Sequence, residues 1–179
     1  MTHAQMMIEE LQQESATTRR FLEQIPADKL TWKPHDKSMA AGQLAMHVAT
    51  IPGMIASMVL EDRVPAPDFS VGFPQPDELD AVLRAHDDAV TTATDALAQF
   101  DDAKMSTMWR MMAGDIELFA MPRAAFLRSV LFNHLYHHRG QLGVYLRLLG
   151  ATVPSAYGPS GDETPPDFEK MMEVIAAHA

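Results

Sequence analysis

The chain carries, toward its C-terminus, the stretch Asn133-His134-Leu135-Tyr136-His137-His138-Arg139-Gly140-Gln141-Leu142, which has the spacing of a long helix. His134 and His138 are four residues apart, so on a helix their rings lie about 40° apart on one face and can reach one cation. The other positions on that face are apolar, namely Leu127, Leu131, Leu142, Tyr145 and Leu149. Buried imidazoles are costly without partners, and a shared metal ion would satisfy both rings.

A third histidine, His47, stands in an apolar face of an earlier helical segment, among Leu44, Ile51, Met54, Ile55 and Met58. Three neutral imidazoles from two helices leave one coordination position for water or substrate, as in catalytic zinc sites. The sequence therefore predicts a metal site formed by His47, His134 and His138. The alternative is that these histidines are hydrogen-bonded structural residues of the core.

Three neighbours of the histidine pair are candidates for a supporting role. His137 could pair with His134 in place of His138, but it points about 100° away from His138, so the three cannot comfortably share one ion. The apolar face favours His138, and His137 is expected beside the site or in the substrate pocket. Gln141 is expected there as well. Arg139 either binds an anionic group of the substrate or is paired with a carboxylate or solvent. The remaining histidines are expected at the surface, at His3, His35, His86 and His178.

The composition narrows the classes of function. The chain has 179 residues, which is the length of a single domain spanning residues 1–179. Its net charge of −10 and the lack of a basic cluster argue against nucleic-acid binding. Without cysteine, any metal must be held by nitrogen and oxygen. No signal peptide or membrane-spanning apolar run is seen, so a cytoplasmic protein is expected.

Apolar periodicity predicts four long helices and a short final one. Ser38 and Asp77 are the expected N-caps of the second and third helices, and Pro52 is expected to kink the second. The expected ranges are His3–Ile25, Ser38–Leu60, Asp77–Phe100, Pro122–Leu149 and, for the short helix, Asp167–Ala177.

The proline-rich segment Glu61–Pro76 is long enough to return the chain to the end of the molecule at which the second helix begins. Its residues can span about 50 Å, against about 35 Å for the preceding helix, so the second and third helices can run parallel. A short hairpin is expected where Thr107–Met112 and Ile116–Ala120 flank residues 113–115. The predicted fold is therefore all-α, a four-helix bundle with one long crossover and a possible hairpin before the fourth helix.

Several stretches resemble the DinB (damage-inducible) family, which includes the DinB/YfiT-like metalloenzymes. The likeness extends over nearly the whole chain and is carried by Asn133–Leu149, Trp32–Met39, Gln43–Gly53 and Pro154–Glu163. The resemblance implies up-down-down-up helix connectivity and one divalent metal ion, often nickel or zinc. Its ligands would be His47, His134 and His138, and a homodimer is common in the family.

The resemblance also suggests an activity. Relatives include S-transferases that use low-molecular-weight thiols, such as bacillithiol or mycothiol, and a maleylpyruvate isomerase. The residue after His134 is Leu135, so the glutamate base of a His-Glu-x-x-His metalloprotease is missing. A metal-dependent transferase with a small-molecule substrate and a thiol is therefore expected. The alternatives are a metal-dependent hydrolase and a non-catalytic metal-binding stress-response protein.

Overall fold

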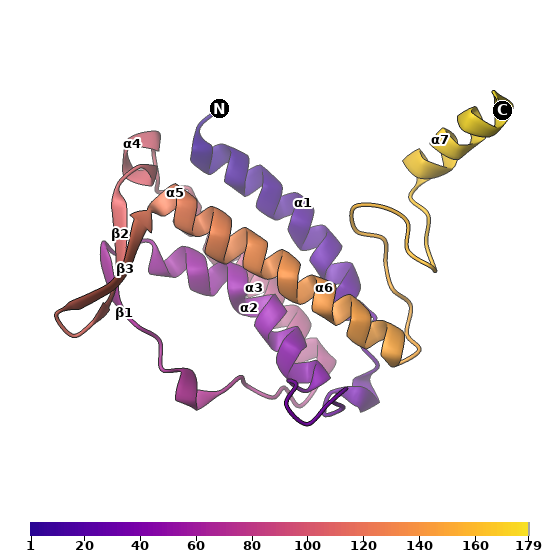
Figure 1. Cartoon of the computed structure of the whole chain (residues 1–179), viewed down its shortest axis with the longest axis horizontal. Coiled ribbons are helices and arrows are strands. Elements are labelled where there is room, and N and C mark those ends of the chain that lie inside the picture. The colour runs from indigo at the N-terminus through magenta and orange to yellow at the C-terminus, as the bar shows by residue number, and fades with distance from the viewer. Residues whose placement is uncertain (179) are drawn as a thin grey trace.

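The computed structural model describes residues 1–178 and, of Phe69, only the backbone. Most of the chain is helical, and four long helices pack around one core (Figure 1). The last of them is continuous but irregular, because a π-helical segment, Leu127–Phe132, separates α5 from α6. The bounds of the long helices are α1 His3–Glu23, α2 Ala41–Met58, α3 Leu79–Leu97, α5 Arg123–Phe126 and α6 Asn133–Leu148.

Contacts between the helices give their relative directions. Gly42, at the start of α2, lies against Pro76 just before α3, and Gly53 lies against Ala89 further along both helices. α2 and α3 are therefore parallel, as the long segment between them allows.

The first and last long helices are also parallel to each other. Tyr136 donates a hydrogen bond to Glu10, and further along Gly143 faces the ring of Phe21. Arg123, at the start of α5, donates to the carbonyl of Val59 just after α2, so the last helix is antiparallel to α2. The four long helices therefore run up, down, down and up.

A small sheet closes one end of the helices, so the prediction of an all-α chain was wrong and a four-helix bundle is an incomplete description. β2 (Met108–Ala113) and β3 (Ile116–Pro122) are antiparallel, with Gly114 at φ 58° in the turn, which confirms the hairpin. β1 (Arg63–Pro65) adds a third, parallel strand from within the crossover. β1 is an edge strand, a position in which a sheet accommodates proline. Because it has only three residues and the last of them is a proline, the sequence showed no strand pattern there.

The two predicted N-caps differ from those observed. α2 begins after Ala40, whose N–H donates to the side chain of Gln43 at 2.9 Å, and Ser38 is not its cap. α3 begins after Glu78, so Asp77 lies outside it. The interior of α2 continues through Pro52 without interruption. Both errors arise because several polar residues precede each helix and local capping preference alone does not choose among them.

The C-terminal helix α7 (Pro166–Ala177) lies apart from the other helices in Figure 1. None of its residues is buried, and its exposed apolar side chains are Met171, Met172, Val174 and Ile175. Within the described residues, no helix is both long enough and apolar enough to cross a membrane.

Candidate metal centre

The three predicted ligands meet between α2 and α6. His47 is on the inner face of α2 and only 8% exposed, while His134 and His138 are on consecutive turns of α6. Each ring offers one nitrogen, and these nitrogens all lie within 4.8 Å of one another. The group is therefore compatible with binding one metal ion.

The spacing of two ring nitrogens fits a tetrahedral ion. The Nε2 atoms of His47 and His134 are 3.3 Å apart. Metal–nitrogen bonds of about 2.0–2.1 Å place two tetrahedral ligands about 3.3–3.4 Å apart. Two neutral rings facing each other can share only one hydrogen between these atoms, whereas a cation can accept the lone pairs of both.

Gln141 determines which nitrogen of His138 carries the proton. The Nδ1 atom of His138 lies 2.7 Å from Oε1 of Gln141, an atom that can only accept a hydrogen bond. Nδ1 is therefore the protonated nitrogen, and the lone pair of Nε2 is free to bind a cation. Such outer partners commonly orient metal-ligating histidines.

The environment keeps the three rings neutral. Burial and, to a smaller extent, the neighbouring rings of His138 and His134 together lower the pKa of His47 to about 4. Burial also lowers the pKa of His138 and of His134. For His134, the nearby Val130 backbone partly offsets this lowering of the pKa. Nδ1 of His134 is buried, and no hydrogen-bond partner lies within bonding distance of it among the described residues. Neutral imidazole is the form that binds metals.

The π-helical segment aligns the last long helix with the site. Phe126, Val130, His134 and His138 are spaced four residues apart, and all of them line one pocket. In a regular α-helix each such step rotates the side chain by about 40°, and three steps would carry it out of the pocket. Four residues make slightly more than one full turn of an α-helix but slightly less than one full turn of the wider π-helix. The π segment therefore rotates the side chains in the opposite sense and partly cancels this drift.

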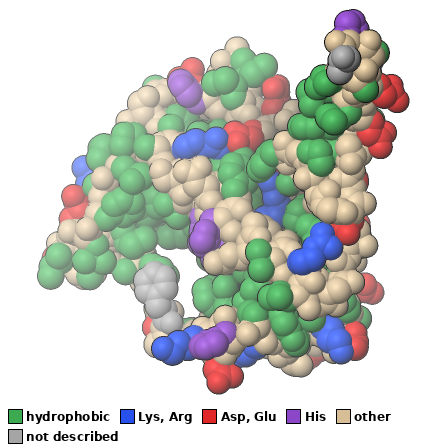
Figure 2. Space-filling model, turned by 45° about the vertical axis from the view of Figure 1, so that its right-hand side comes forward, with side chains coloured by type: hydrophobic (Ala, Val, Ile, Leu, Met, Phe, Trp, Pro, Cys, Tyr) green, Lys and Arg blue, Asp and Glu red, His purple; other side chains and the backbone are tan. Residues whose placement is uncertain are grey.

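The histidines lie in the wall of a large apolar pocket of about 660 Å³. α2 and the last long helix form its sides, and the crossover segment Pro67–Pro74 contributes further residues. The ring of Phe73 packs on His47, with 4.5 Å between ring centroids. Figure 2 shows that one face of the molecule is hollowed and that hydrophobic side chains border the hollow.

The remaining predicted residues lie outside this pocket. His137 is exposed, and its ring packs on His138 at 4.8 Å between centroids. Arg139 is buried and faces α1, where it pairs with Glu14 at 2.6 Å and donates to Tyr157 at 2.7 Å. Arg139 is thus the carboxylate-paired residue of the two alternatives, and it is not available to a substrate in the pocket.

Some site features were not visible in the sequence. His86, expected at the surface, is only 3% exposed on α3, because the face of α3 that carries it packs against the other helices. Phe73 and Met111 line the pocket from the crossover and from β2, so no helical periodicity identifies them. Helical spacing is the signal that could have pointed to lining residues, because it links Val130 to His134 and it links Met54, Ile55 and Met58 to His47.

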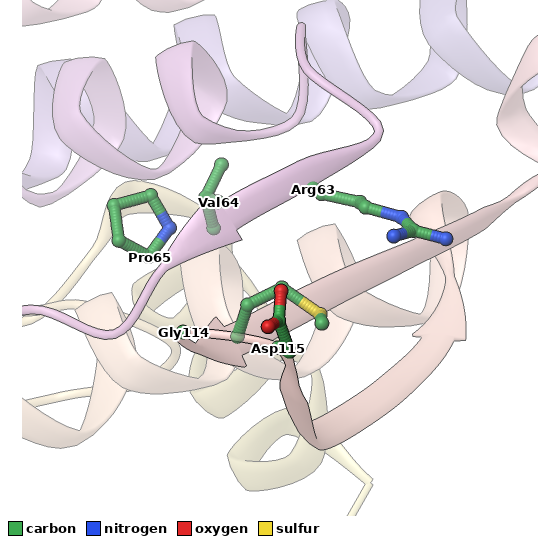
Figure 3. Close-up of a pocket in the computed structure, with 6 residues that line it drawn as sticks. Arg63, Val64, Pro65, Gly114 and Asp115 are labelled. Carbon is green, nitrogen blue, oxygen red and sulfur yellow. The ribbon is translucent and has the colours of Figure 1, made fainter.

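A second hollow, of about 370 Å³, lies at the sheet (Figure 3). It is lined by Arg63, Val64, Pro65, Met112, Gly114 and Asp115. Among its described lining residues there is no histidine, and Asp115 is the only carboxylate. The first pocket is therefore the candidate site.

Comparison with known proteins identifies the family of this chain. The model of the DinB family matches residues 1–168. The chain belongs to the DinB family. This DinB protein is 27% identical over 152 residues to the uncharacterized protein YrdA of Bacillus subtilis (strain 168), covering 84% of this chain and 85% of YrdA.

Two solved DinB-like proteins have the same fold. One, from Bacillus cereus ATCC 10987, superposes with a TM-score of 0.64 at 24% identity, covering 83% of this chain and 94% of its own. The other, YjoA of Bacillus subtilis, gives a TM-score of 0.65 at 22% identity, covering 84% and 95%. At these identities the likeness concerns the fold alone.

Proposed function

We propose that this DinB-family protein is a metal-dependent transferase that activates a low-molecular-weight thiol. The observation that carries the proposal is the convergence of His47, His134 and His138 in the wall of an apolar pocket. These residues would hold one divalent ion, nickel or zinc, which suit imidazole ligands. When bound, such an ion lowers the pKa of a coordinated thiol so that it ionises at neutral pH.

Apart from the three histidines, the described lining residues of the pocket include one potential base. Among its described lining residues, Asp68 is the only carboxylate, and its Oδ1 accepts hydrogen bonds from the backbone and hydroxyl of Ser70 at 2.8 and 2.6 Å. These bonds lower the pKa of Asp68, which makes it a poor base. A thiol activated by an ion requires no protein base, whereas a thiol activated by the protein alone would.

In the proposed reaction, the thiol loses its proton to solvent and its sulfur forms a bond to an electrophilic carbon. The leaving group departs with the electron pair of the bond that breaks. Gln141 keeps the ring of His138 in the tautomer described above, and the apolar walls exclude water that would compete with the thiol.

The test measures conjugation of bacillithiol and of mycothiol to monochlorobimane by fluorescence, with zinc- or nickel-loaded and metal-free protein. Metal-dependent conjugation is expected in the wild type and in His137→Ala, but not in His134→Ala. Turnover of ester substrates without any thiol would favour a hydrolase instead. A metal-dependent melting temperature without turnover of either kind would favour the non-catalytic alternative.

A further inference from the structure

The candidate pocket is an elongated groove with unlike ends. It follows α2 from His47 through Ile55 to Met58, and the antiparallel last helix from His138 to Phe126. The eleven residue-to-residue steps from His47 to Met58 correspond to about 16 Å of helix. The histidines lie toward one end of this length, and apolar side chains form the rest.

The end remote from the histidines is closed by the sheet. The indole N–H of Trp109 donates to the carbonyl of Met58 at 2.9 Å, and its ring packs on Phe126 at 3.9 Å between centroids. Met111, two residues along β2, lines the groove at this end. Figure 1 shows the sheet beside the end of α2 and the start of α5. Three methionines line the groove, and their flexible side chains suit apolar groups of variable shape.

The groove offers nothing to pair with a negative charge away from the histidines. Asp68 is the only charged side chain among its described lining residues, and no lysine or arginine lines it. An unpaired charge in an apolar wall is costly, and the Asp68 carboxylate would add repulsion for an anion. A charge on a bound ion would favour an anionic group only near the histidines.

From this arrangement we infer that the electrophilic co-substrate is an elongated molecule whose reactive end lies at the histidines and whose other end is an uncharged apolar tail. The inference rests on the proposed function for the role of the histidines. That the tail is uncharged and apolar follows from the lining of the groove alone. A cavity of about 660 Å³ accommodates a ligand of ordinary small-molecule size.

Two matched ligands test the inference, namely 1-octylimidazole and 8-(imidazol-1-yl)octanoate. Both present the same imidazole to an ion, and they differ in the charge at the tail. Calorimetric titration of zinc-loaded protein is expected to show that the octyl compound binds at least about tenfold more tightly.

Met111 and Met112 provide a matched pair of variants. Met111 lines the groove, whereas Met112, the next residue, lines the other hollow with Arg63 and Asp115 (Figure 3). Met111→Lys is expected to tighten binding of the octanoate about tenfold, while Met112→Lys leaves it unchanged. Asp68→Asn keeps the acceptor for Ser70 and removes the charge, so it provides a milder second variant that should also favour the octanoate.

Titrations with metal-free protein separate this inference from the proposed function. If zinc does not strengthen binding of either ligand but the preference for the octyl tail persists, the metal site fails and the tail assignment stands. Equal affinities of the two ligands, or equal effects of Met111→Lys and Met112→Lys, would overturn the inference.

Discussion

Single side chains outside the ligand set control how the histidines are presented. Gln141 is exposed, so it contributes little to the core, yet its side-chain oxygen accepts the only hydrogen bond of the His138 ring among the described residues. Without it, the His138 ring is free to rotate and to exchange its two tautomers. The cost of the change should therefore fall on metal affinity and not on stability.

Replacing Gln141 tests this role. Gln141→Leu is expected to weaken zinc binding about tenfold or more, as loss of an outer partner commonly does, with unchanged unfolding free energy. Gln141→Glu retains an acceptor and is expected to bind nearly as well as the wild type. Competition with a chromophoric chelator measures both. Equal affinity of Gln141→Leu and the wild type would show that the hydrogen bond does not orient the ligand.

His86 predicts a dependence of stability on pH. Burial lowers its pKa, which the neighbouring Asp87 carboxylate, 3.2 Å from Nδ1, only partly offsets. The unfolded chain therefore takes up this proton more readily than the folded chain. Stability from this residue is complete above the unfolded pKa of about 6.5 and is lost as the pH falls toward the lower folded value.

The measurement is the free energy of unfolding in urea at neutral pH and at pH 5. In His86→Leu, the decrease between these two conditions is expected to be smaller than in the wild type. The exposed His35 serves as the control, because His35→Leu should leave the decrease unchanged. A decrease in His86→Leu equal to that of the wild type would contradict the role of His86.

The three ligand candidates were predictable because each histidine interrupts an apolar helical face. His86 was not, because a lone histidine among the acidic and small residues of α3 resembles a surface position. The partner of Arg139 was also hidden, since Glu14 is 125 residues away in the sequence. Pairings over such distances depend on helix packing, which local periodicity does not determine.

At the level of elements, close packing of α2 on α3 holds His47 in place. A Cβ atom on Gly53 would lie 2.9 Å from Cα and 3.0 Å from the carbonyl oxygen of Ala89, so the two helices would have to separate. By contrast, a Cβ atom on Gly140 of α6 would meet nothing within 4 Å. The same substitution at these two glycines should therefore have opposite effects.

Gly53→Ala is expected to destabilise the protein by about 1–3 kcal/mol, because overpacking forces the backbone to move. Gly140→Ala is expected to stabilise it by about 0.5–1 kcal/mol, since glycine is a poor helix former. Urea unfolding of both variants provides the measurement. Changes of the same sign would show that the contact between α2 and α3 is not as tight as described.

Helices were easier to predict than the features that interrupt them. The hairpin was found from Gly114 and its flanking apolar runs, but β1 consists of three residues in a proline-rich segment. The π-helical segment has no distinct pattern, because its residues are as apolar as those of an ordinary helix. Yet this segment aligns Val130 with His134, so an element that the sequence did not reveal positions the site.

At the scale of the whole molecule, the helices and sheet form one body and α7 lies outside it. The family model also ends at residue 168, near the start of α7. Since no residue of α7 is buried, its apolar side chains add little to the stability of the rest.

Removing residues 166–179 is therefore expected to change the melting temperature by less than about 2 °C. Zinc affinity should remain that of the full chain. Differential scanning calorimetry with and without zinc measures both effects. A large drop in melting temperature would mean that α7 packs on the other helices in solution.

The arrangement of the whole molecule brings residues 47, 134 and 138 together, and the central claim is that they share one ion. Crystals grown with zinc and measured at the zinc absorption edge test it most directly. The account predicts one strong anomalous peak about 2.0–2.1 Å from a ring nitrogen of each of His47, His134 and His138. A zinc peak elsewhere with none between these three rings would contradict it.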